Sequence, residues 1–152
     1  MVIAIIGESC TGKTTLAEKL QNHIGGEIYT GKDYLRLAKN ESMARKLFQK
    51  KMESCSDTSP IIYVISDPEL LTLLPKNAIR ILVTANLDQI KKRFAARIHG
   101  NLPAPVAAML ERKHGCFNTS TYDIHVISSE FNTDLLCSQV KNMLMLSQPS
   151  YN

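Results

Sequence analysis

Eight residues near the start of the chain, Gly7-Glu-Ser-Cys-Thr-Gly-Lys-Thr14, constrain the possible folds more than any other segment. They fit the pattern G-x-x-x-x-G-K-[ST] at every specified position. The apolar, largely β-branched run Val2–Ile6 precedes them, which is typical of a strand buried on both faces of a parallel sheet. Segment 14–23 follows, with apolar residues at helical spacing. This order of strand, glycine-containing loop and helix predicts an α/β protein.

The rest of the chain repeats the alternation of short apolar runs with segments of helical period. Further strands are expected at 27–29, 61–65, 79–84 and 123–127. Further helices are expected at 33–39, 42–53, 68–74, 87–98, 106–114 and 132–146. Such alternation predicts βαβ units in three layers, with a five-stranded parallel sheet flanked by helices. The length of 152 residues fits a single domain, 1–152.

Composition narrows the classes of protein. With 44% hydrophobic and 21% charged residues the chain is an ordinary globular sequence, and no apolar run is long enough to span a membrane. The first residues lack the basic region of a signal peptide, so we expect a cytoplasmic protein. A net charge of +4 suits an enzyme that acts on phosphorylated molecules. No stretch of the sequence alternates basic with aromatic residues, so nucleic acid is not an expected partner. Four cysteines without a CxxC pair favour free thiols.

The chemistry of phosphate binding explains the spacing of the loop. Backbone N–H groups wrap the anion, glycines allow sharp turns, and the following helix directs its N-terminal amides at the same ligand. We expect Lys13 to reach the β- and γ-phosphates of ATP, Thr14 to bind Mg²⁺ and Thr15 to contact the α-phosphate. The residues expected to bind the nucleotide are Gly7, Glu8, Ser9, Cys10, Thr11, Gly12, Lys13, Thr14 and Thr15. Cys10 is either a thiolate favoured by Lys13 or a small residue fitted to a tight loop.

The position of this loop, the short chain and the placement of the arginines resemble the nucleoside monophosphate kinase group, which includes adenylate, cytidylate and shikimate kinases. The resemblance implies a P-loop NTPase fold with an acceptor-binding segment at about 30–60 and a lid at about 97–115. It also implies an enzyme that moves the γ-phosphate of MgATP to a nucleotide or another small metabolite.

Two segments resemble the acceptor-binding and metal-binding elements of that group. Thr30-Gly-Lys-Asp-Tyr-Leu-Arg36 is similar to the S/T-G-x-x-x-R element, which implies that Arg36 grips an acceptor phosphate. A solvated position on a helix is the alternative for Arg36. Asp67 follows the apolar run 61–65 as in a Walker B strand, so it either serves Mg²⁺ and substrate or caps the next helix. Asp33 is the alternative carboxylate, suited to orienting or deprotonating a hydroxyl acceptor.

Arginines after the fourth strand resemble those of a lid that closes over ATP. Arg93 and Arg97 lie four residues apart on one helical face, and Arg112 follows a Gly-Asn-Leu-Pro-Ala-Pro segment. The resemblance makes these three, with Lys13 and Asp33, the candidate catalytic residues. An ordinary solvated basic helix is the alternative for Arg93 and Arg97. Because the lid pattern is irregular, a nucleotide-binding regulatory or interaction protein is the competing hypothesis. The sequence names neither the acceptor nor the oligomeric state.

Overall fold

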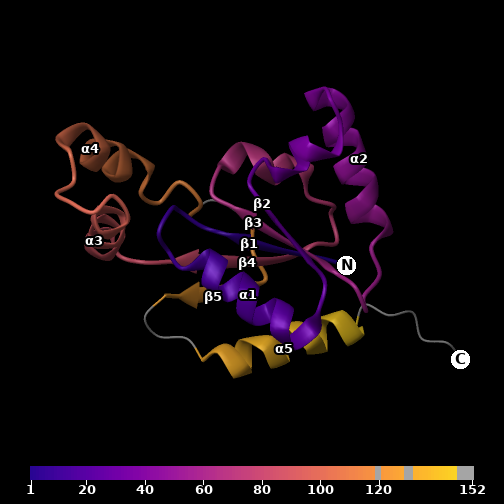
Figure 1. Ribbon diagram of the computed structural model, residues 1–152. Coiled ribbons are helices and arrows are strands. Elements are labelled where there is room, and N and C mark those ends of the chain that lie inside the picture. Colours follow the sequence, from indigo (N-terminus) through magenta and orange to yellow (C-terminus); the bar gives the residue numbers. More distant parts are fainter. Residues whose placement is uncertain (119–120, 129–131, 147–152) are drawn as a thin grey trace, which may run out of the picture.

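A parallel sheet of five strands forms the middle layer of the computed structural model, which describes residues 1–118, 121–128 and 132–146 (Figure 1). The strand order is β2-β3-β1-β4-β5, and every pairing between neighbours is parallel. The strands are β1 (Val2–Ile6), β2 (Glu27–Thr30), β3 (Ile61–Ile65), β4 (Ile79–Thr84) and β5 (Ile124–Ile127). The expected five-stranded parallel sheet is therefore confirmed.

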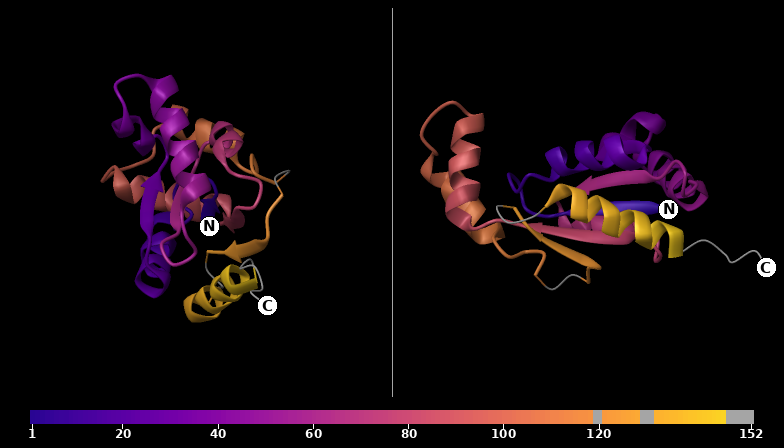
Figure 2. Two further views of the ribbon diagram at one scale, coloured as in Figure 1. Left: turned by 90° about the vertical axis from the view of Figure 1, so that its right-hand side faces the viewer. Right: turned by 90° about the horizontal axis from the view of Figure 1, so that it is seen from below.

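Helices cover both faces of the sheet, which gives the expected three layers (Figure 2). α1 (Lys13–Ile24) and α5 (Thr133–Leu146) cover one face and α2 (Glu41–Ser54) covers the other, whereas α3 (Leu87–Arg97) and α4 (Ala104–Lys113) lie beyond the end of the sheet. Successive residues of a strand point to opposite faces, so β1 divides its side chains between two cores. Ile3 and Ile5 pack with α1 and α5, whereas Ala4 and Ile6 pack on the side of α2.

Two of the expected helices are single 3₁₀ segments. They are η1 (Asp33–Leu37) and η2 (Pro68–Leu73). Short 3₁₀ pieces are common as connectors, and η2 ends just before Leu74, which adopts an extended conformation because Pro75 follows it. At the end of η1, Ala38 is also extended, so the chain turns there before α2 begins.

An aromatic cluster holds the segment between β2 and β3 on the sheet. The ring of Phe48 on α2 lies 4.8 Å from Tyr29, 5.4 Å from Tyr34 and 4.9 Å from Tyr63, centroid to centroid. All four side chains are buried. The hydroxyl of Tyr63 donates a hydrogen bond to Gly31 O at 2.6 Å, and burial raises the pKa of this phenol. The cluster therefore fixes the turn that follows β2, at the carboxyl edge of the sheet.

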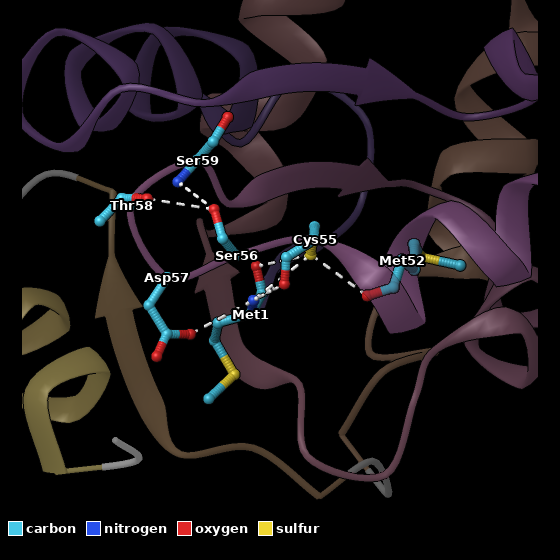
Figure 3. Close-up of polar contacts among 7 residues, drawn as sticks. All are labelled: Met1, Met52, Cys55, Ser56, Asp57, Thr58 and Ser59. Carbon is cyan, nitrogen blue, oxygen red and sulfur yellow. Dashed lines mark hydrogen bonds and ion pairs between the residues drawn. The ribbon is translucent and has the colours of Figure 1, made fainter. Parts of the chain in front are cut away.

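The turn between α2 and β3 is anchored on the start of the chain (Figure 3). The amino group of Met1 donates to Cys55 O at 2.9 Å and lies 3.4 Å from the carboxylate of Asp57. This contact holds the amino ends of β1 and β3 together. At their carboxyl ends Ile6 and Ile65 are register partners, and the loop with the glycine pattern begins directly after them.

Helices α3 and α4 lie side by side beyond the carboxyl end of β4 (Figures 1 and 2). They pack on the loop after β1 through a small apolar cluster that contains Cys10, Ala85, Ile90 and Leu110. No helix among the described residues is long and apolar enough to cross a membrane.

Candidate active site

The loop between β1 and α1 contains two residues with a positive φ and one glycine that no larger residue could replace. Gly12 has a φ of 92° and Cys10 a φ of 63°, both in the left-handed region. A Cβ at Gly7 would collide with the carbonyl oxygen of Val83 on β4, so the loop leaves β1 where only glycine fits. Gly7 N donates to Ile65 O at 3.1 Å, which ties the start of the loop to β3.

Lys13 is the buried cation of the loop. Its side chain is 5% exposed, and its Nζ donates to Glu8 O and lies 3.4 Å from Thr11 Oγ1. Burial lowers the pKa of Lys13 to about 8, and the positive charge of Arg97 acts in the same direction. Its hydrogen-bond partners within the described part of the chain are neutral oxygens rather than a carboxylate. Such an ammonium is suited to an incoming anion.

Two hollows meet at this loop and share Cys10, Gly12, Thr15 and Arg97. The first, of about 410 Å³, lies toward α3 and β5 and is lined by Cys10, Gly12, Thr15, Lys19, Arg93, Arg97 and Ser128. The second, of about 190 Å³, extends to the carboxyl ends of β2 and β3 and is lined by Ser9, Cys10, Gly12, Lys13, Thr14, Thr15, Thr30, Val64, Ser66 and Arg97. Ligands of open α/β sheets bind beyond the carboxyl ends of the strands, where both hollows lie.

The structure brings Arg93 and Arg97 of α3 to the loop. Arg93 Nη1 donates to Cys10 O at 3.1 Å and to Ser128 Oγ at 3.0 Å. Arg97 lines both hollows. These contacts favour a role at the loop over that of an ordinary solvated helix. Cys10 is buried in the apolar cluster beneath α3 and α4, which favours the small residue fitted to a tight loop over a reactive thiolate.

Three predicted residues lie elsewhere. Arg112 is exposed on α4 and lines neither hollow. The guanidinium of Arg36 lies 4.7 Å above the ring of Tyr29 and 4.0 Å from the carboxylate of Glu27, the first residue of β2. Asp67 accepts a hydrogen bond from the amide of Glu69 at 3.1 Å, so it serves as the cap of η2, one of the two alternatives that the sequence left open.

Asp33 borders the second hollow without being among its lining residues. Its Oδ2 accepts a hydrogen bond from the amide of Thr30 at 3.1 Å, and Thr30 lines the hollow. Asp33 is therefore connected to the hollow through Thr30, whereas the contacts of Arg36 are with Glu27 and Tyr29 of β2.

Sequence reasoning missed two serines at strand ends and one side-chain contact of the loop. Ser66 follows β3 and Ser128 follows β5, and each lines a hollow. The rule that ligands gather at the carboxyl ends of parallel strands could have found both. The carboxylate of Glu8 contacts His114, 106 residues away, and no local pattern in the sequence signals that contact.

The loop is suited to a magnesium ion that is bound together with a phosphate, rather than to one held by several protein carboxylates. The described residues contain no group of three or more His, Cys, Asp or Glu side chains placed to hold a metal. Thr14 offers a hydroxyl oxygen at the second hollow. Mg²⁺ commonly takes one or two protein ligands together with substrate phosphates and water, which agrees with this arrangement.

Comparison with known proteins defines the class of fold. No protein-family model matches the chain, and no curated protein matches it either. Among solved structures it is similar to a sugar kinase from Janibacter sp. HTCC2649, with 16% identity over 96% of this chain and 95% of that one and a TM-score of 0.61. A gluconokinase from Sinorhizobium meliloti 1021 has 10% identity over 95% and 91% of the two chains, with a TM-score of 0.59.

A shikimate kinase from Aquifex aeolicus vf5 has 17% identity over 97% of this chain and 100% of that one, with a TM-score of 0.52. At such identities the likeness concerns the fold. The chain has the α/β fold of the P-loop kinases, with five parallel strands flanked by helices.

Proposed function

We propose that the protein is a phosphotransferase that moves the γ-phosphate of MgATP to a small metabolite. One observation carries the proposal: the buried ammonium of Lys13 lies inside a complete G-x-x-x-x-G-K-T loop, with Arg93 and Arg97 at its mouth. Phosphoryl transfer depends mainly on positioning and on neutralising the charge of the transferring group. Three cations around one loop supply that neutralisation.

Each residue of the proposed site has a separate role in binding or transfer of the phosphoryl group. The amides of the loop and of the first turn of α1 bind the phosphates, and Lys13 contacts the β- and γ-phosphates. Thr14 contributes a hydroxyl to Mg²⁺, which neutralises charge on the phosphates when bound. Arg97, which lines both hollows, is placed to contact the phosphoryl group as it passes from donor to acceptor.

The second hollow is the proposed acceptor site. Its wall at the ends of β2 and β3 consists of Thr30, Val64 and Ser66, which suit a hydroxyl-bearing molecule. Asp33, bound to the amide of Thr30, is the proposed group that orients the hydroxyl. The contacts of Arg36 with Glu27 and Tyr29 make a nucleotide acceptor less well supported, because no other arginine of η1 could grip its phosphate.

A nucleotide-binding regulatory or interaction protein is the second candidate. The observation that favours it is the exposed position of Arg112, which leaves α4 without an arginine at either hollow. Arg93 and Arg97 weigh against it, since both reach the loop from α3.

Acceptor-dependent release of ADP separates the two candidates. The purified protein is incubated with MgATP and a panel of polyols, sugars, hydroxy acids, nucleosides and nucleoside monophosphates. The kinase predicts release that rises with one class of acceptor and is lost in Lys13→Ala. A matched control, Lys76→Ala, changes an exposed lysine in the turn before β4 and is expected to keep the activity. Nucleotide binding without acceptor-dependent release across the panel would favour the regulatory protein.

A further inference from the structure

Glu8 makes contacts in two directions from the middle of the loop. Its backbone oxygen accepts hydrogen bonds from Lys13 Nζ and, at 2.9 Å, from Thr11 Oγ1. Its carboxylate points to the end of α4, where Oε2 accepts from the amide of Gly115 at 3.2 Å and Oε1 lies 3.1 Å from His114 Nδ1. The side chain of Glu8 is only 13% exposed, so these partners replace much of its hydration.

The position of that carboxylate needs an explanation if the loop binds a polyphosphate. A negative charge next to a phosphate site opposes ligand binding by Coulomb repulsion. Glu8 directs its charge away from the hollows and onto donors of the segment after α4, and it lines neither hollow. The side chain is thus arranged to hold α4 rather than the ligand.

Helix α4 is in turn connected to the arginines of α3. Lys91 Nζ on α3 and Glu111 Oε1 on α4 form an ion pair at 2.6 Å, and the two helices share the apolar cluster that includes Leu110. Arg93 then returns from α3 to the loop at Cys10 O. The loop therefore contacts α3 through Cys10 and the end of α4 through Glu8.

We propose that Glu8 is a positioning residue that couples phosphate binding in the loop to the placement of α4. The proposal rests on the proposed function, because it assumes that Lys13 contacts a phosphate. When Lys13 Nζ transfers its hydrogen bond from Glu8 O to a phosphate oxygen, the peptide of Glu8 loses its charged donor. The adjustment of that peptide reaches Gly115 and His114 directly through the Glu8 carboxylate. Binding in the loop then changes the contacts that hold the end of α4 and, through α4, the position of α3.

The amide of Gly115 is a direct reporter of this contact. In the ligand-free protein Glu8→Ala removes its acceptor, so exchange of the Gly115 amide hydrogen is expected to speed up by about tenfold, the effect of losing a hydrogen bond to a charged group. Glu8→Gln keeps a side-chain oxygen that can accept a hydrogen bond from Gly115 N, so exchange of the Gly115 amide hydrogen is expected to speed up less than in Glu8→Ala. The matched control Glu53→Ala, on the far side of the molecule in α2, leaves it unchanged.

Addition of MgADP tests the coupling itself. In the wild-type protein and in Glu53→Ala, saturation with MgADP is expected to change exchange at Gly115; in Glu8→Ala it is expected to have no effect there although MgADP still binds. A second readout is turnover: Glu8→Ala lowers kcat by about tenfold while the KM for ATP changes much less, since misplaced catalytic groups affect the reaction more than binding.

The outcomes separate this proposal from the proposed function. Failure of MgADP to bind the wild-type protein contradicts the proposed function, whereas the ligand-free comparison of Glu8→Ala still reports the contact. Binding of MgADP with no change at Gly115 in the wild-type protein, or with the same change in Glu8→Ala, overturns the coupling. Should Glu8→Ala not fold, the same comparison is made with Glu8→Gln and with His114→Ala, each of which removes part of the contact.

Discussion

The buried ammonium of Lys13 gives the site a distinctive dependence on pH. Burial lowers the pKa of Lys13 from its usual 10.5 to about 8 in the folded protein. One pKa unit corresponds to about 1.4 kcal/mol, so keeping this lysine charged costs the folded state about 3 kcal/mol at pH 7. Between pH 8 and 10.5 the unfolded chain binds the proton and the folded protein does not, so the free energy of unfolding rises with pH across that window.

The proposed nucleotide binding is expected to respond in the opposite direction. A polyphosphate favours the charged form of Lys13, and deprotonation of the free protein therefore weakens binding. Above pH 8 the Kd for MgADP is expected to rise by about tenfold for each pH unit, whereas below pH 7 it is expected to be insensitive to Lys13. In Lys13→Met this part of the pH dependence disappears.

Urea denaturation of the ligand-free wild-type protein and of Lys13→Met between pH 7 and 10 measures the first effect. The difference between the two proteins isolates Lys13, because the other titrating groups, Tyr63 included, cancel. We expect Lys13→Met to be the more stable at pH 7 and the difference to shrink as pH rises. A constant difference from pH 7 to 10, or one that grows, would refute the inference that Lys13 is held charged at a cost.

Three further predictions concern packing and the arginines. Gly7→Ala places a Cβ against the carbonyl oxygen of Val83 and is expected to lower the free energy of unfolding by about 1–3 kcal/mol and to abolish nucleotide binding, measured by denaturation and by titration. Gly100→Ala, whose Cβ would make only an ordinary van der Waals contact with Ile98 O, is the control. Phe48→Ala removes the ring that packs against three tyrosines and is expected to lower the free energy of unfolding, measured by urea denaturation, by about 3–5 kcal/mol. A decrease below about 1 kcal/mol would contradict the packing of Phe48 in the aromatic cluster. Arg93→Ala is expected to lower kcat about 10²-fold or more in the ADP-release assay, because Arg93 contacts the loop. Arg112→Ala, at an exposed position, is expected to have little effect on kcat. Equal losses of kcat in the two variants would contradict this difference in role.

The sheet could be predicted from the sequence because its strands carry strong local signals. Continuous β-branched runs such as Ile61–Ile65 are buried on both faces, and the structure has that strand with the same bounds. The 3₁₀ segments could not be distinguished from short α-helices, since apolar spacing over five or six residues is the same for both, although Pro75 marks the end of η2. Local patterns therefore gave the elements but not the geometry of the connections.

The site was predictable where it is local and unpredictable where it depends on distant partners. The loop carries its pattern in consecutive residues, so Lys13 and its neighbours could be named as candidates from the sequence alone. Arg36 follows β2 at a spacing that suits a phosphate grip, yet the buried ring of Tyr29 lies beneath it and draws its guanidinium toward Glu27. The contact of Glu8 with Gly115 joins residues that only the folded chain brings together.

Transfer of radioactive phosphorus from the terminal position of ATP is the most direct test of the central claim. The wild-type protein, incubated with Mg²⁺, labelled ATP and the acceptor panel, is expected to place the label on one class of small hydroxylated molecule. Lys13→Ala is expected to transfer none, while Lys76→Ala transfers as the wild type does. Label that stays on ATP or appears only as free phosphate with every acceptor, or equal transfer by Lys13→Ala, would contradict the assignment of this loop as the centre of a phosphotransferase.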